Sequence, residues 1–253
     1  MYQRIIPSLL IKGNRLVKGI RFGSFRDAGN PRTTARAYSN QSADELLVLD
    51  ISASKKQRMP DIEQIRLIAD ECFVPLTVGG GIRSVDDALA CLDSGADKVC
   101  LNTAAIDNPT LIQELAHKLG SQAIVVSIDL VKKTDGSFGL YDHRCNKMVL
   151  AKDPLLWAAK CAEWGAGEIR IMNVEREGTL RGFDLEAYRS IRERVDIPIV
   201  VEGGAGELTD LEAAINLGVN GVAIGAMLVF SDANLVKIRQ YLLSRSANVR
   251  PMG

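Results

Sequence analysis

Short apolar runs alternate along the chain with segments whose apolar residues recur every three or four positions. The runs are rich in Val, Ile and Leu, which is typical of parallel strands buried on both faces. The segments between them, such as "DIEQIRLIADEC" (61–72) and "DPLLWAAKCAEWG" (153–165), have the period of amphipathic helices. Eight strands are predicted, at residues 4–10, 45–51, 75–80, 97–102, 123–129, 168–174, 197–204 and 220–226.

This pattern occurs twice, with an offset of 123 residues. Glu45 and Glu168 each open a strand, and Gly80–Gly81 and Gly203–Gly204 each close one. Two four-strand units, each too small to close alone, predict one α/β domain over residues 1–253, a (β/α)₈ TIM barrel built from two half-barrel repeats. A doubly wound open sheet is the alternative, but eight strands in an even repeat favour the barrel.

Composition narrows the class of partner. Lys plus Arg and Asp plus Glu are both 31, so a zero net charge gives no support for general binding to nucleic acid or to an anionic membrane. The apolar runs are too short for a signal peptide or a membrane span. Five cysteines, an odd number without CxxC spacing, favour a reduced cytoplasmic protein. Two histidines far apart in sequence make a metal site improbable, and we expect no cofactor.

Glycines at the predicted strand ends suggest phosphate sites, because backbone N–H groups without a Cβ beside them approach an anion closely. In such barrels the chemistry lies at the carboxyl ends of the strands. Glycines that only make tight turns are the alternative, but two matched cups favour a phosphorylated substrate with a phosphate at each end. One cup contains Gly80, Gly81, Asn102 and Thr103, and the other contains Gly178, Gly203, Gly204, Gly225 and Ala226.

The chain resembles a known family, the cyclase subunit of imidazole glycerol phosphate synthase (HisF), over essentially its whole length. The motifs that carry the resemblance include "RLVKGIRFGSFRDAGNP" (15–31), "VGGGI" (78–82), "GSQAIVVSID" (120–129) and "GGAG" (203–206). The resemblance implies a lyase subunit of a glutamine amidotransferase in histidine biosynthesis, forming a heterodimer with a separate glutaminase. Ammonia from the glutaminase would pass through the barrel to a bisphosphorylated ribulosyl-formimino-carboxamide nucleotide, giving imidazole glycerol phosphate and an aminoimidazole carboxamide nucleotide.

The resemblance also assigns roles to charged residues at the strand starts. A ring that gates the entry of ammonia matches Arg4, Glu45, Lys98 and Glu168, and a residue that faces the glutaminase matches Asp97. Ordinary salt bridges at the bottom of a barrel are the alternative reading of the ring, and these add little when exposed. The equivalence of Glu45 and Glu168 in the repeat favours a ring.

The family has two catalytic aspartates, and only one is present. Asp129 matches the aspartate that ends strand 5, but Leu10 stands at the end of strand 1, and leucine cannot transfer a proton. One hypothesis keeps the cyclase reaction, with Asp50 as the substitute acid. A second is a paralogue that supplies ammonia, with a third, sugar-modifying protein, for amidination of a nucleotide sugar in surface-polysaccharide biosynthesis. A third is a non-catalytic conduit that activates the glutaminase.

Three further positions carry expectations. Lys18 matches the lysine of the family's flexible substrate loop, although a solvated surface lysine is equally consistent. Glu202, beside the second cup, would repel a phosphate if it pointed inward. Residues 132–149 predict a hairpin insertion around "DG" (135–136), in which we expect His143 at the surface.

Overall fold

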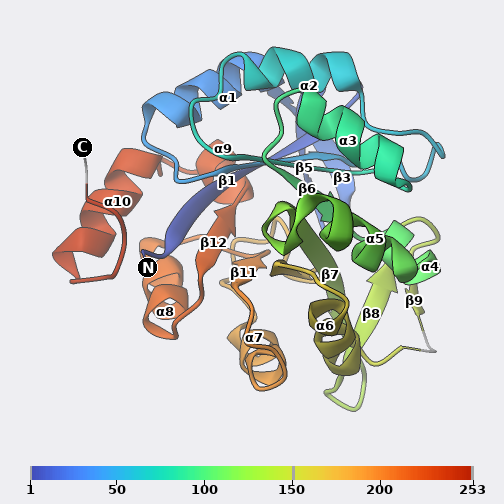
Figure 1. Ribbon diagram of the computed structural model, residues 1–253. Helices are drawn as coiled ribbons and strands as arrows, with labels where there is room; N and C mark the ends of the chain where they lie inside the picture. Colours follow the sequence, from blue (N-terminus) through green and yellow to red (C-terminus); the bar gives the residue numbers. More distant parts are fainter. Residues whose placement is uncertain (1, 150–151, 252–253) are drawn as a thin grey trace.

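Eight parallel strands close into a barrel in the computed structural model, which describes residues 2–149 and 152–251 (Figure 1). Neighbouring strands pair in the order β10-β11-β12-β1-β4-β5-β6-β7, and β10 pairs with β7 to complete the ring. All eight predicted strands are confirmed. The barrel strands are β1 (Arg4–Lys12), β4 (Leu46–Asp50), β5 (Leu76–Gly79), β6 (Lys98–Leu101), β7 (Ile124–Lys132), β10 (Glu168–Asn173), β11 (Ile199–Glu202) and β12 (Gly221–Ile224).

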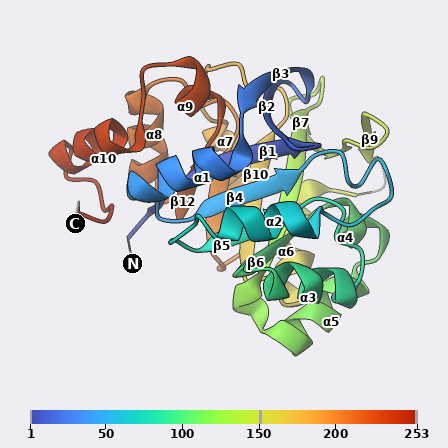
Figure 2. The same ribbon diagram turned by 90° about the horizontal axis from the view of Figure 1, so that it is seen from above.

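Helices between the strands form the outer layer of the barrel (Figure 2). Several begin at a side chain that caps the first turn: Asn30, Asp61 and Ser84 each accept a hydrogen bond from the backbone N–H three residues on. The helices are α1 (Pro31–Asn40), α2 (Ile62–Ala69), α3 (Val85–Asp93), α4 (Thr103–Asp107), α5 (Thr110–Leu119), α6 (Pro154–Glu163), α7 (Leu185–Arg192), α8 (Leu208–Asn216), α9 (Ala226–Phe230) and α10 (Leu235–Ser244), with a 3₁₀ turn, η1 (Ser121–Ala123).

The two halves of the barrel correspond element by element. Helices α6, α7, α8 and α9 begin and end 123 positions after α1, α2, α3 and α4, and strands β11 and β12 do the same relative to β5 and β6. The half-barrel repeat predicted from the sequence is therefore confirmed as a repeat of structure.

Two antiparallel hairpins extend the barrel at the carboxyl ends of its strands. The strands of the first, β2 (Arg15–Ile20) and β3 (Gly23–Gly29), were not predicted, and β2 continues the ladder of β1. The second, β8 (Phe138–Asp142) and β9 (Lys147–Val149), continues β7 and confirms the predicted hairpin insertion. Its turn from β7 contains Gly136 with φ of 84°, a backbone conformation that favours glycine.

Two apolar cores are separated by the barrel wall. The larger lies between strands and helices and includes Ile5, Leu9 and Ile169, whereas the smaller lies inside the barrel and includes Ile6, Leu47 and Val125. Successive residues of a strand point to opposite faces, so one strand supplies both cores. Within residues 2–149 and 152–251, no helix is long and apolar enough to cross a membrane.

Candidate active site

The four predicted ring residues meet at the amino ends of the barrel strands. Arg4 bonds to Glu45 at 2.5 Å and to Glu168 at 2.7 Å, and Lys98 Nζ lies 2.9 Å and 3.5 Å from the same two carboxylates. Thr77 donates a further hydrogen bond to Glu45 at 2.6 Å. Burial alone would raise the pKa of Glu45, but Lys98 and Arg4 hold this pKa below its usual value. The geometry makes a closed, charge-balanced ring, while its role as an ammonia gate stays a prediction.

Asp97 lies exposed beside this ring, directly before β6. Its carboxylate accepts a hydrogen bond from the backbone N–H of Leu76 at 2.8 Å, which ties the starts of two neighbouring strands together. This hydrogen bond does not test the predicted contact of Asp97 with a glutaminase, which stays a prediction.

A thin apolar layer separates the ring from the other end of the barrel. The layer is formed by inward-facing residues of six strands, namely Ile6, Leu47, Cys100, Val125, Val200 and Ala223. Along β6 and β10, Cys100 and Arg170 stand two positions after Lys98 and Glu168, which corresponds to about 7 Å of strand.

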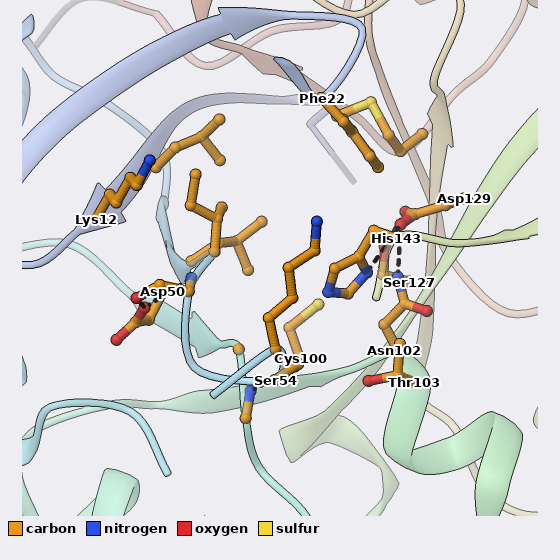
Figure 3. Close-up of a pocket in the computed structure, with 18 of the residues that line it drawn as sticks. Lys12, Phe22, Asp50, Ser54, Cys100, Asn102, Thr103, Ser127, Asp129 and His143 are labelled. Carbon is orange, nitrogen blue, oxygen red and sulfur yellow. Dashed lines mark hydrogen bonds and ion pairs between the residues drawn. The ribbon is translucent and has the colours of Figure 1, made fainter. Parts of the chain in front are cut away.

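A cavity of about 320 Å³ occupies the carboxyl end of the barrel (Figure 3). Its floor includes Cys100 and Arg170, and its wall includes Leu10, the position at which the resemblance implied an acid. The rings of Phe22 and Phe25, from the first hairpin, also line it. A concave, largely apolar site with a few convergent polar groups is the usual form of a small-molecule site.

Asp129, the retained aspartate, projects into this cavity from β7 and is almost completely buried. It accepts hydrogen bonds from Asn102 Nδ2 at 2.8 Å and from Ser127 Oγ at 3.2 Å. Burial raises the pKa of Asp129, and the nearby Arg170 and His143 oppose that rise. Within the described part of the chain, Asn102 Oδ1 has no hydrogen-bond partner, so this amide is oriented by Asp129 and keeps an acceptor for another molecule.

An ion pair that the sequence did not predict joins the neighbouring strands β10 and β11 close to Asp129. Arg170 donates to Glu202 at 2.6 Å and to Ser127 Oγ at 2.6 Å, and its Nη1 lies 3.9 Å from Asp129 Oδ1. Burial would raise the pKa of Glu202, but Arg170 and then Lys18 bring this pKa below its usual value. Glu202 does point inward, as the phosphate-repulsion argument required, and its charge is balanced by Arg170.

Asp50, the suggested substitute acid, lines the cavity but is already engaged. Its Oδ1 accepts from the backbone N–H of Ser52 at 3.0 Å and from the Ser52 hydroxyl at 2.9 Å, and its Oδ2 pairs with Arg58 at 2.8 Å. Both oxygens of this carboxylate are held by donors of the protein itself, so it is not free to turn toward a bound molecule. The geometry therefore gives little support to Asp50 as the missing acid.

The first predicted phosphate cup opens onto the cavity. Gly80 and Gly81 follow β5 with φ of 98° and 80°, and a Cβ on either would lie 2.2 Å from a backbone oxygen. Asn102 and Thr103, at the start of α4, line the same wall, and Lys55 enters from the loop after β4. The backbone conformation needs glycine here whatever the cup binds, so its binding of phosphate stays a prediction.

The second cup is filled from inside the protein. Its free space is about 20 Å³, room for about one water molecule. Lys18 donates to the backbone oxygen of Ser8 at 2.5 Å, and a Cβ on Gly225 would lie 2.4 Å from Lys18 Nζ. Two carboxylates, Glu177 and Glu202, line this space. The remaining members of the predicted cup, Gly178, Gly203, Gly204 and Ala226, lie around it.

Lys18 is not the solvated surface lysine that the sequence allowed. Only 3% of it is exposed, and burial lowers its pKa to about 8, although Glu202 and Glu177 favour its charged form. The hairpin that carries it is anchored to the loop after β10, since Arg21 N donates to the backbone oxygen of Glu177 and Phe22 N donates to its carboxylate.

The expectation that His143 lies at the surface was also wrong. It lines the cavity with a side chain only 22% exposed, and its Nδ1 lies 3.9 Å from Asp129 Oδ2. Figure 3 shows the imidazole beside Asp129, on the side of the cavity that also carries Asn102 and Ser127. The expectation failed because the hairpin β8–β9 turns back over the mouth of the barrel, which the local sequence does not show.

Sequence reasoning missed two residues, for different reasons. Arg170 had a usable signal, since it stands two positions after Glu168 in a strand and must therefore share its inward face. His143 had no such signal.

No three His, Cys, Asp or Glu side chains converge as metal ligands within residues 2–149 and 152–251.

Comparison with known proteins shows the family of this chain. The family described as histidine biosynthesis protein matches residues 4–234. Similar chains include the imidazole glycerol phosphate synthase subunits HisF of Chlorobium luteolum (43% identity over 249 residues), Alkaliphilus metalliredigens (38% over 249 residues) and Streptomyces griseus (39% over 247 residues), each aligned over 98% of both chains. The protein described here therefore belongs to the histidine biosynthesis protein family, as a HisF-type chain.

Proposed function

We propose that this chain is the synthase subunit of a glutamine amidotransferase, which takes ammonia at the amino end of its barrel and uses it at the carboxyl end. The relatives are named as imidazole glycerol phosphate synthase subunits, so the first reaction to consider is the conversion of the bisphosphorylated nucleotide to imidazole glycerol phosphate in histidine biosynthesis. The partner is a HisH-type glutaminase, forming a heterodimer.

The short separation between ring and cavity is the observation that carries this proposal. Lys98 and Glu168 belong to the ring, and two positions further along the same strands Cys100 and Arg170 line the cavity. Ammonia needs to cross only one inward-facing layer, about 7 Å of strand. An apolar layer suits a neutral nucleophile, because it excludes ammonium and water more strongly than ammonia.

Isotope competition tests this passage. The chain is mixed with a HisH-type glutaminase, amide-¹⁵N glutamine, unlabelled ammonium chloride and the bisphosphorylated nucleotide. Product labelled mainly with ¹⁵N is expected, and Lys98→Met is expected to shift the label toward the bulk ammonium, because the ring then loses one of its two cations. Arg66→Met, on the exposed face of α2, serves as the matched control. Product that follows the bulk ammonium in the parent chain would contradict the passage.

A difference between the two predicted phosphate cups favours a second candidate function. Leu10 replaces one acid, and the second cup is filled by Lys18 with two carboxylates beside it, whereas the first cup stays open. This asymmetry suits an acceptor with a phosphate at one end only. A paralogue that supplies ammonia for amidination of a nucleotide sugar, together with a third, sugar-modifying protein, fits this asymmetry, because a nucleotide sugar has one diphosphate group and not two separate phosphates.

Binding of two commercial sugar phosphates separates the two candidates. Ribulose 1,5-bisphosphate and ribulose 5-phosphate are titrated calorimetrically into the chain. Similar affinities, within about threefold, support the single-phosphate acceptor, whereas a bisphosphate bound more than tenfold tighter supports the family substrate. Stimulated glutaminase activity without binding of either compound, and without turnover of the nucleotide, is the result expected of a non-catalytic conduit.

A further inference from the structure

We infer that His143 and Asp129 together form the proton-transfer pair of this active site, with His143 supplying the function that Leu10 cannot. This inference rests on the proposed function, since it concerns the same cavity. Both side chains line the cavity, and the 3.9 Å between His143 Nδ1 and Asp129 Oδ2 is too long for a direct hydrogen bond but short enough for one reacting group to contact both.

Contacts of the residues before and after His143 fix its position. Asp142 accepts from the backbone N–H of Arg144 at 2.8 Å and from its guanidinium at 2.7 Å, and the other edge of that guanidinium binds Asp107 at the end of α4. Tyr141 packs edge-on against Phe22 with ring centroids 6.0 Å apart, which joins the second hairpin to the first. The turn that carries the imidazole is therefore fixed to two other elements, as a proton-transfer group requires.

The carboxylates around the cavity that could act as the second proton-transfer group are already engaged. Asp50 is held by Ser52 and Arg58, and Glu202 is held by Arg170. Glu177 accepts from the backbone N–H of Phe22 and faces Lys18 in the closed cup. Among the titratable groups described around the cavity, His143 has no strong ion pair or hydrogen bond of this kind and yet faces Asp129 directly.

Burial brings the pKa values of the two groups toward each other. Burial lowers the pKa of His143, and Asp129 and Asp142 oppose this while Lys55 and Arg144 add to it. Burial also raises the pKa of Asp129, against Arg170 and His143. A carboxyl group and an imidazole whose pKa values approach each other exchange a proton with little cost, which suits an acid–base pair.

The chemistry is the addition of ammonia to an unsaturated carbon of the acceptor. The nitrogen lone pair forms the new N–C bond, and the carbon–oxygen π pair moves onto oxygen. His143, as the imidazolium, gives a proton to that oxygen, and the Asp129 carboxylate takes one proton from the added nitrogen. The sum is NH₃ plus C=O giving C(OH)NH₂, and proton return from Asp129 to His143 resets the pair.

Histidine NMR tests the pairing without needing the acceptor. The chain has only two histidines, and His117 lies exposed on α5, so it serves as the internal reference. With labelled histidine, Asp129→Asn is expected to lower the His143 midpoint by about one pH unit or more, because a carboxylate that favours the charged imidazole is lost. The His117 midpoint stays in place. A His143 midpoint unmoved by Asp129→Asn would overturn the pair.

Turnover tests the transfer itself. His143→Gln is expected to lower kcat with ammonium and the bisphosphorylated nucleotide about 10²–10³-fold, with little change in KM. His143→Ala is expected to regain part of that rate in added imidazole, which a purely structural role would not produce. Full activity of His143→Gln would refute the inference. If the parent chain does not turn over this nucleotide, the family reaction fails while the NMR result still decides on the pair.

Discussion

The Arg170–Glu202 ion pair allows a direct test of how much a buried, compensated charge contributes to the stability of this barrel. Both side chains are buried, at 4% and 7% exposure, and they bond at 2.6 Å. Arg170→Met would leave Glu202 without its cation and would remove a donor from Ser127. We expect this variant to lose about 3–5 kcal/mol of unfolding free energy, because one charge of a buried pair then stays uncompensated.

The double variant separates charge compensation from packing. Arg170→Met combined with Glu202→Leu removes both charges and is expected to recover the loss to within about 1 kcal/mol of the parent, since apolar groups of similar volume can replace a buried pair. Urea unfolding followed by circular dichroism measures all four corners of the cycle. Arg66→Met, which breaks an exposed pair with Glu63 at 3.4 Å, is the control and should cost under about 0.5 kcal/mol.

The pH dependence of the single variant adds an independent check. The pKa of Glu202 lies below its usual value in the folded chain, so its pair contributes stability above the unfolded pKa and loses it as pH falls. The gap between the parent and Arg170→Met should therefore narrow below about pH 5. A single variant that costs under 1 kcal/mol, or a double variant as unstable as the single, would refute the assignment of this pair as a compensated buried charge.

Three further outcomes follow from the same structure. The parent chain should become more stable between about pH 8 and pH 10, because the pKa of Lys18 is about 8 in the folded chain, below its unfolded value, and the charged amine opposes folding until it loses its proton. Lys18→Met should abolish this rise, which thermal melts of both proteins across the range measure. The same pH profile in parent and variant would contradict the burial of Lys18. Gly81→Ala should lower the thermal midpoint by several degrees, since φ is 80° and the new Cβ would lie 2.2 Å from the backbone oxygen of Arg58. Gly13→Ala is the control and should lower the midpoint less, because φ is 61° but the space around the new Cβ is open. Equal losses in the two variants would contradict the steric argument. Leu10→Asp should change turnover of the bisphosphorylated nucleotide with ammonium by less than about tenfold, because His143 already faces Asp129 in the same cavity. A gain of more than about tenfold would contradict the assignment of that role to His143.

Much of the fold was readable because its signals are local. Apolar strands, amphipathic helices and the 123-residue offset each depend on residues close in sequence, and the eight strands and the half-barrel repeat followed from them. The ring residues were predicted as a set from the family resemblance, and they meet because residues at strand starts lie at one end of any closed barrel. The first hairpin escaped prediction, since its pairing with β1 depends on contacts that propensity does not encode.

Tertiary structure alone decided the character of the active site. The sequence places a leucine where the resemblance implied an acid, but only the folded chain shows that Asp50 is bound by Arg58 and that His143 faces Asp129. The same holds for Lys18, whose burial depends on a hairpin closing over the second cup. These side chains come from loops and strand faces far apart in sequence, and their charges acquire meaning only from the partners that barrel closure brings within a few ångströms.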